Sequence, residues 1–229
     1  MSVQLDQIIP WGRSRREYEL MFSLGSDDWQ CRILGCGDGP ASFNAEMTGA
    51  GYSVVSVDPI YCHSGSEIAA RFEASWETVM EQVRATLNKW NWDYHRNPDG
   101  LLANRRKAMA KFLADFEAGR QAGRYQIALL PNLPFSDGNF DLALCSHLLF
   151  LYSEHLSEEF HIKSVRELCR VAREVRIFPL LTLSHQPSPH ISPVRANLEP
   201  AGWSSEIVRV NYEFQKGGNK MLRIFRRGL

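Results

Sequence analysis

The residues best suited to chemistry are a glycine-rich turn and an acid nineteen residues beyond it. The turn is Gly35-Cys36-Gly37-Asp38-Gly39, and the acid is Asp58. Glycines let the backbone adopt positive φ angles and approach a ligand closely. An acid at the end of the following strand can accept hydrogen bonds from both ribose hydroxyls of an adenosine. Together, the turn and the acid favour a nucleotide-binding site over a turn with a purely structural role.

The spacing of the glycines indicates which class of nucleotide the site could bind. The dinucleotide fingerprint is G-x-G-x-x-G, which places a pyrophosphate at a helix N-terminus, whereas this chain has G-x-G-x-G. The sequence also contains no G-x-x-x-x-G-K-[ST] segment, which is the phosphate-binding loop for ATP or GTP. The spacing therefore disfavours both dinucleotides and nucleoside triphosphates.

The chain around the turn alternates between strand-like and helix-like segments. Apolar runs predict strands at 31–35, 52–57, 125–130, 140–145 and 174–183. Helical segments are predicted at 40–50, 157–172 and 192–201. A β-hairpin is predicted at 205–214 and 219–226. Alternating strands and helices indicate a parallel α/β sheet, and the hairpin brings the sheet to seven strands.

Two further segments extend this repeating pattern. Ser14 and Glu17 have the spacing of a capping box, which predicts an N-terminal helix at 13–24. The stretch 64–124 has helical periodicity and no convincing strand, so we expect a helical insert. Its helices are predicted at about 65–94 and 99–122, separated by an Asn-Pro-Asp-Gly turn. We expect a single domain over 1–229 that carries both additions.

Composition narrows the class of protein. A chain of 229 residues with 44% apolar content can bury a substantial core. Its 26 basic and 26 acidic side chains balance, which disfavours nucleic acid or a membrane surface as the partner. The N-terminus has no basic stretch followed by an apolar one, so we expect a cytoplasmic protein. Five cysteines without a C-x-x-C pair indicate free thiols and no metal site.

Three segments resemble motifs of the class I S-adenosylmethionine-dependent methyltransferases. Ile33–Gly39, Val54–Asp58 and Leu133–Asp141 resemble the family's first-, second- and fourth-strand motifs and occur in the family's order. The resemblance covers the chain from about residue 28 to the end. It implies a Rossmann-like three-layer α/β sandwich with a seven-stranded, mostly parallel sheet and an antiparallel last strand. The helical insert then follows strand 2, and the implied cofactor is S-adenosyl-L-methionine.

The resemblance also implies roles for individual residues. The glycine turn would cradle the methionine part of the cofactor, Asp58 would hold the ribose, and Pro59-Ile60 would flank the adenine. Ser146 and His147 would face the methyl group. The implied cofactor-binding residues are Gly35, Cys36, Gly37, Asp38, Gly39, Asp58, Pro59, Leu130 and Ser146. His147 is the candidate catalytic base, with His63 and Tyr61 as alternatives, although a histidine at a strand end can equally be a hydrogen-bonded structural residue.

The chain departs from the family pattern at two positions. The family usually has an acid two residues before the first glycine, where this chain has Ile33. A second acid usually follows the third strand and meets the adenine amine, where this chain has Leu129. An adenine would therefore need backbone contacts.

Other polar and aromatic groups have both a functional and a structural interpretation. Arg105-Arg106-Lys107 could contact RNA phosphates, but a short charge run on a helix is typical of a solvated face. His155 and His161, with nearby glutamates, could bind a metal, but carboxylates at a helix start also favour its dipole. The insert aromatics could form a substrate wall or pack the insert against the sheet; they are Trp76, Trp90, Trp92 and Tyr94.

These observations lead to a functional hypothesis with one main alternative. The first hypothesis is S-adenosylmethionine-dependent methyl transfer to a small-molecule acceptor, with the insert and the Trp11-Gly12-Arg13 segment closing over the cofactor. The alternative is a non-catalytic S-adenosylmethionine-binding module with a protein partner, which Ile33 and Leu129 favour. A third hypothesis, an unrelated nucleotide-binding α/β protein, is disfavoured by the glycine spacing.

Overall fold

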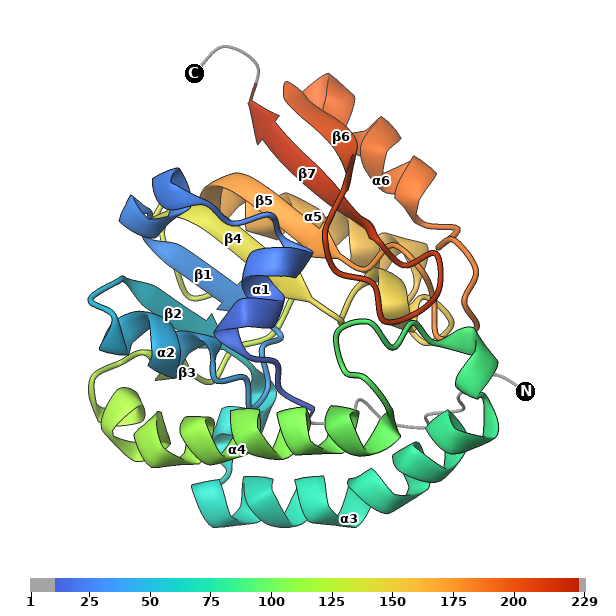
Figure 1. Ribbon diagram of the computed structural model, residues 1–229. Coiled ribbons are helices and arrows are strands. Elements are labelled where there is room, and N and C mark those ends of the chain that lie inside the picture. The colour runs from blue at the N-terminus through green and yellow to red at the C-terminus, as the bar shows by residue number, and fades with distance from the viewer. Residues whose placement is uncertain (1–10, 227–229) are drawn as a thin grey trace.

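A seven-stranded sheet runs through the centre of the protein in the computed structural model, which describes residues 11–226 (Figure 1). The strands are β1 Ile33–Cys36, β2 Val54–Val57, β3 Tyr125–Gln126, β4 Phe140–Ser146, β5 Ala172–Phe178, β6 Trp203–Arg209 and β7 Lys220–Arg226. Their order is β3-β2-β1-β4-β5-β7-β6, and β7 is antiparallel to both of its neighbours. The predicted seven-stranded Rossmann-like fold with an antiparallel last strand is confirmed.

The central strands are apolar on both sides because both sides of the sheet are covered. Ile33 faces a core formed with α1 Arg15–Met21 and α2 Phe43–Gly49. Leu34 points the other way, into a core shared with α5 Glu158–Val171 and α6 Ile191–Leu198. Burial on both faces explains the continuous apolar runs of parallel strands. These two helical layers and the sheet form the three-layer sandwich.

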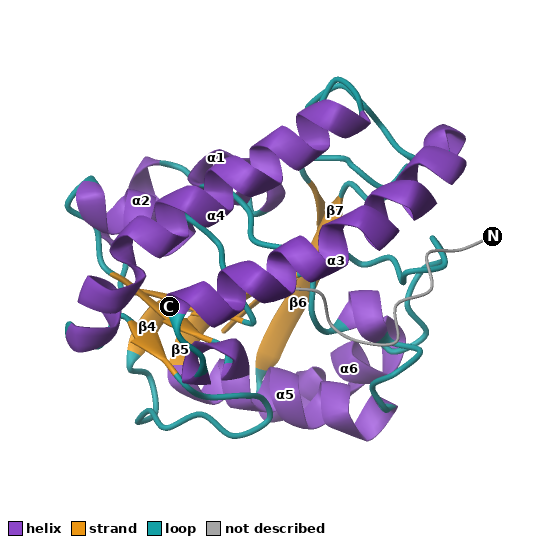
Figure 2. Cartoon of the chain, turned by 90° about the horizontal axis from the view of Figure 1, so that it is seen from below, coloured by secondary structure: helices purple, strands orange, loops and turns teal. Residues whose placement is uncertain are grey.

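The insert supplies two long helices at one end of the sheet. They are α3 Gly65–Ala85 and α4 Pro98–Gln121, which pack against each other (Figure 2). Ser64 and Glu67 form a capping box at the start of α3, and Asn97 caps α4. The two helices share their own aromatic core with Tyr61, which follows β2. The insert therefore lies across the carboxyl ends of β1 and β2, where the glycine turn and Asp58 are found (Figure 1).

Short 3-10 helices occur between the main elements, at Ser26–Gln30, Pro59–Cys62, Leu87–Lys89, Phe150–Tyr152 and Glu199–Ala201. Among the described residues, no helix is both long and apolar enough to cross a bilayer.

Some predicted boundaries were wrong, for identifiable reasons. The strand predicted at 125–130 pairs only as Tyr125–Gln126, because its one neighbour, β2, ends at Val57. The strand predicted at 174–183 ends at Phe178, because Pro179 has no N–H for the ladder. The first insert helix ends at Ala85 rather than near 94, and the hairpin strand predicted to reach 214 ends at Arg209.

Candidate functional site

The glycine turn leaves β1 in a conformation that only glycine adopts easily. Gly37 and Gly39 have φ angles of 70° and 52°, in the left-handed region. A Cβ on Gly37 would lie 2.6 Å from Leu148 Cδ2, whereas a Cβ on Gly39 would meet nothing closer than Asp58 at 4.0 Å. Glycine is therefore favoured at position 37 by both the backbone conformation and the contact with Leu148. At Gly39 the space beside the backbone is free, so a ligand can approach the turn there.

Gly35 accommodates an acid of the same turn. The Asp38 carboxylate folds back over it, so that a Cβ on Gly35 would lie 1.9 Å from Asp38 Oδ2. The carboxylate accepts hydrogen bonds from Tyr18 Oη and Ser56 Oγ, both at 2.6 Å. Burial raises the pKa of Asp38 to about 6, against the effect of these two donors. Asp38 thus anchors the turn to α1 and β2.

Asp58 fixes the turn from the other side. Its Oδ2 accepts the Gly39 N–H at 2.8 Å, and its Oδ1 accepts the Ile60 N–H at 2.9 Å. Burial raises the pKa of Asp58, and the two backbone donors oppose that rise. Each carboxylate oxygen has a second lone pair. Asp58 can therefore hold the turn and still accept two hydroxyl groups from a ligand.

A cavity of about 900 Å³ opens beside the turn and Asp58. This volume is within the range of roughly 300–1,000 Å³ that is usual for small-molecule sites. Of the predicted site residues, those that line it are Cys36, Gly37, Asp38, Gly39, Asp58, Pro59, Leu130, Ser146 and His147. Gly35 does not line the cavity, because the Asp38 side chain covers it. The alternative candidate His63 also lines it, whereas Tyr61 is buried and donates its hydroxyl to the Gly39 carbonyl at 2.7 Å.

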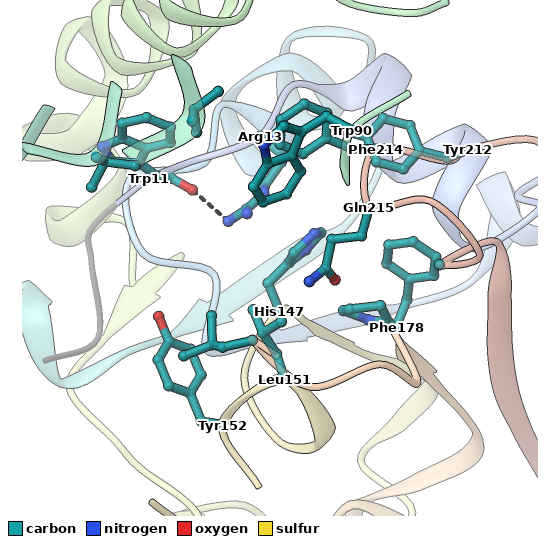
Figure 3. Close-up of a pocket in the computed structure, with 15 residues that line it drawn as sticks. Trp11, Arg13, Trp90, His147, Leu151, Tyr152, Phe178, Tyr212, Phe214 and Gln215 are labelled. Atoms are coloured by element: carbon teal, nitrogen blue, oxygen red, sulfur yellow. Dashed lines mark hydrogen bonds between the residues drawn. The ribbon is translucent and has the colours of Figure 1, made fainter. Parts of the chain in front are cut away.

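A second, smaller cavity of about 110 Å³ shares lining residues with the first. Figure 3 shows the side chains around this smaller cavity. Its walls are mainly apolar and aromatic and include Trp11, Trp90, Tyr152, Phe178, Tyr212 and Phe214. Trp11, Arg13, Val79 and His147 line both cavities. These four residues therefore mark the junction between a cavity beside the glycine turn and an aromatic one.

His147, at this junction, has an unusual backbone conformation. It follows β4 with a φ angle of 52°, and its N–H donates to the Phe178 carbonyl at 2.7 Å. Positive φ is strained for a residue with a side chain, and such strain often occurs at functional sites. His147 Nδ1 lies 2.9 Å from Ser146 Oγ. Burial and the charges of Arg13 and Arg105 keep the pKa of His147 well below its usual value, so the imidazole is neutral.

A buried ion pair lies behind the junction. Arg105 contacts both carboxylate oxygens of Glu17, at 2.8 and 3.0 Å. Burial alone would raise the pKa of Glu17, but the Arg105 guanidinium outweighs it and lowers that pKa to about 2. The interpretation of Arg105-Arg106-Lys107 as a solvated face was wrong for Arg105, which is 2% exposed, and holds for Arg106 and Lys107.

The other candidates have structural contacts. Of the insert aromatics, Trp90 lines the smaller cavity, whereas Trp92 packs on Phe214 and Trp76 lies under Arg106. His161 is buried between the carbonyls of Ser157 and Leu149. Within residues 11–226, no group of three or more histidine, cysteine or acidic side chains is arranged to hold a metal.

Comparison with known proteins gives one close relative in sequence. An uncharacterized protein of Methanocaldococcus jannaschii, MJ0045, is 31% identical over 225 residues, which are 98% of this chain and 99% of that protein. The chain belongs to the same family as this archaeal protein. No general family model matches the chain.

Solved structures of similar fold include methyltransferases. Magnesium protoporphyrin IX methyltransferase of Synechocystis, with bound S-adenosylhomocysteine, is 13% identical over 86% of this chain and 74% of that one, with a TM-score of 0.46. A Burkholderia thailandensis 1,6-didemethyltoxoflavin N1-methyltransferase is 12% identical over 92% and 75%, with a TM-score of 0.47. A putative S-adenosyl-L-methionine-dependent methyltransferase of Methanococcus maripaludis is 12% identical over 94% and 84%, with a TM-score of 0.46. The chain has the Rossmann-like fold of class I methyltransferases, as its strand order shows.

Several lining residues had no signal in the sequence. Arg71, Ser75 and Thr78 come from α3, and Phe160 comes from α5. The three α3 residues reach the cavity because the insert folds back over the sheet, and Phe160 reaches it from the start of α5. Trp11 and Arg13 line both cavities, and the closure of the Trp11-Gly12-Arg13 segment over a cofactor stays a prediction.

Proposed function

We propose that the protein binds S-adenosylmethionine in the larger cavity and transfers its methyl group to a small, mainly apolar acceptor in the smaller one. The observation that carries this proposal is the junction of the two cavities at His147, next to the glycine turn. Methyl transfer from a sulfonium is an in-line displacement, so the protein chiefly has to position both reactants and exclude water. Two adjoining cavities in one cleft meet that requirement.

The residues around the larger cavity fit the cofactor. Asp58 has the free lone pairs that two ribose hydroxyls need, and Gly39 leaves the end of the turn open. Pro59 and Ile60 offer an apolar surface for an adenine ring. The third-strand acid is replaced by Leu129, whose side chain is 60% exposed at the same cavity. The adenine amine would then be recognised by backbone groups of the loop after β3.

His147 can orient the acceptor. Its neutral ring can accept a hydrogen bond from an acceptor hydroxyl or amine, which would aim a lone pair at the methyl group. Because its pKa is lowered, His147 is a weak base and does not readily keep a proton taken from the acceptor. We therefore propose that His147 orients the nucleophile, and that any proton lost during transfer passes on to water or to another group.

The substitution Asp58→Ala tests the cofactor site. Losing a hydrogen bond to a polar ligand group costs on the order of 1–3 kcal/mol, so the Kd for S-adenosylmethionine should rise about tenfold to a hundredfold. The Kd is measured by calorimetric titration with S-adenosylmethionine and S-adenosylhomocysteine, with NAD and adenosine as reference ligands. Asp99→Asn is the matched control, because the Asp99 side chain is 84% exposed. Equal affinity of Asp58→Ala and wild type would refute the site.

The non-catalytic binding module is the second candidate, and Leu129 and the buried Ile33 favour it. Both candidates predict cofactor binding, so a different readout separates them. Release of S-adenosylhomocysteine is measured during incubation with a panel of aromatic acids, phenols and amines. Turnover that is lost in His147→Ala supports the enzyme, whereas tight cofactor binding without turnover on any acceptor supports the module.

A further inference from the structure

The group at the junction that the function above leaves unexplained is the guanidinium of Arg13. Its Nη1 donates to the Trp11 carbonyl at 2.6 Å, the contact drawn as a dashed line in Figure 3. Its Nε is buried and has no hydrogen-bond partner among residues 11–226. No carboxylate in that described range forms an ion pair with it. The indole Nε1 of Trp11 is also buried without a partner there.

The charges around Arg13 do not cancel. Glu17 is already held by Arg105 through two hydrogen bonds. His95 is neutral near pH 7, because burial lowers its pKa to about 3. Tyr212 is also neutral, because burial raises the pKa of its hydroxyl. The buried residues Glu17, Arg105, His95 and Tyr212 together with the partly buried Arg13 therefore carry one net positive charge.

A guanidinium that is partly buried, with an unsatisfied Nε and no ion pair within residues 11–226, is incompletely compensated by the protein. Burial, together with repulsion from Arg105, lowers the pKa of Arg13 to about 10. The guanidinium is nevertheless still charged near pH 7. Arg13 lines both cavities and is the one charged side chain among those that line the smaller cavity in the described chain. An anionic ligand at this point would supply the missing charge.

We propose that Arg13 binds a ligand carboxylate at the junction of the two cavities, with the Trp11 indole N–H as a second donor. A guanidinium suits this role, because its planar set of donors matches the two oxygens of a carboxylate. The inference rests on the proposed function, which supplies two sources of that carboxylate: the methionine end of the cofactor, or an acceptor bound in the aromatic cavity. An acceptor that uses Arg13 would be a planar aromatic acid, since the remaining walls are uncharged and mainly apolar or aromatic.

The experiment compares Arg13→Met, Arg13→Lys and wild type by calorimetric titration. The first arm uses S-adenosylhomocysteine and its decarboxylated analogue, which lacks only the carboxylate. The second arm uses protein saturated with S-adenosylhomocysteine, titrated with 2-naphthoate and with the neutral 2-naphthamide. Arg16→Met is the matched control, because it removes a positive charge from an exposed position on α1.

The stability of Arg13→Met separates a binding role from a structural one. Methionine keeps much of the apolar stem and removes the partly buried, unpaired charge, so the Tm should equal or exceed that of wild type. A residue kept for binding at a cost in stability behaves in this way. Arg13→Lys keeps the charge without the planar geometry and should retain part of the affinity.

The two arms distinguish the sources of the carboxylate. If Arg13→Met weakens S-adenosylhomocysteine about tenfold or more and leaves the decarboxylated analogue unchanged, the cofactor supplies it. If it weakens only 2-naphthoate, the acceptor supplies it. Unchanged affinity for both carboxylates, or a lower Tm with unchanged affinity, overturns the proposal. Failure of wild type itself to bind S-adenosylhomocysteine would instead refute the cofactor site and, with it, the inference.

Discussion

Asp38 does structural work that its place in the glycine turn does not reveal. A turn acid next to a ligand cavity is a natural candidate for a ligand contact. Its two oxygens accept hydrogen bonds from Tyr18 and Ser56 and its side chain is buried, whereas Asp58 is partly exposed, so Asp38 chiefly joins three elements at the end of β1. The open part of the turn is Gly39, and the group that remains able to bind hydroxyls is Asp58.

The raised pKa of Asp38 predicts a specific pH dependence of stability. Its folded-state pKa is about 6, against an ordinary value of 3.8. The folded state therefore holds the proton more tightly, and this contribution to stability is present at low pH and lost as pH rises from about 4 to 6. Asp38→Asn removes that loss, so its stability relative to wild type should improve by roughly 2 kcal/mol between pH 4 and 7.

The difference between the two proteins isolates Asp38, because Glu17 and His95 titrate alike in both. It is measured as the free energy of unfolding in urea at pH 4, 5, 6 and 7. A difference that stays constant with pH would show that Asp38 ionises at its ordinary pKa despite its burial.

At the scale of elements, the Glu17–Arg105 pair joins α1 to the insert helix α4. The two side chains are 88 residues apart in the chain and are 0% and 2% exposed. Removing one partner leaves an uncompensated buried charge, which typically costs about 3–5 kcal/mol. Glu17→Gln and Arg105→Met should each destabilise the protein by about that amount.

A double-variant cycle tests whether the two residues act as a pair. Removing both charges together should cost less than the sum of the single changes, by about 1–3 kcal/mol. Unfolding in urea gives the three free energies. Strict additivity would mean that each side chain contributes through its other contacts, such as the bond from Tyr212 to Glu17.

This pair also illustrates what the sequence could and could not indicate. Local patterns were sufficient for the glycine turn, the capping box at Ser14 and the strands around Asp58, because neighbouring residues determine them. The role of Arg105 was not visible, since a basic run on a helix has the same pattern whether or not one member meets an acid from another helix. Strand ends at β3 and β5 were missed because they depend on the neighbouring strand and on Pro179.

At the scale of the whole molecule, the insert covers the carboxyl ends of β1 and β2 and supplies one wall of both cavities. Residues of α3 line both cavities. Arg71, Ser75 and Thr78 line the larger cavity, and Val83 lines the smaller one. Val79 lines both. The glycine turn and Asp58 form the floor beneath them. Ligand binding should therefore link the insert to the sheet and stabilise both together.

Hydrogen exchange tests this coupling. Saturating S-adenosylhomocysteine should slow amide exchange along α3, because a ligand beneath the helix stabilises it against local opening. A ligand at a hundred times its Kd adds about 2.7 kcal/mol to the free energy of unfolding, which is enough to raise the Tm measurably. Helix α6 packs beside α5 and lines neither cavity, so it provides the internal reference. Protection that grows in α6 as much as in α3 would indicate global stabilisation from a different site, whereas protection concentrated in α3 and the glycine turn would locate the ligand between the insert and the sheet.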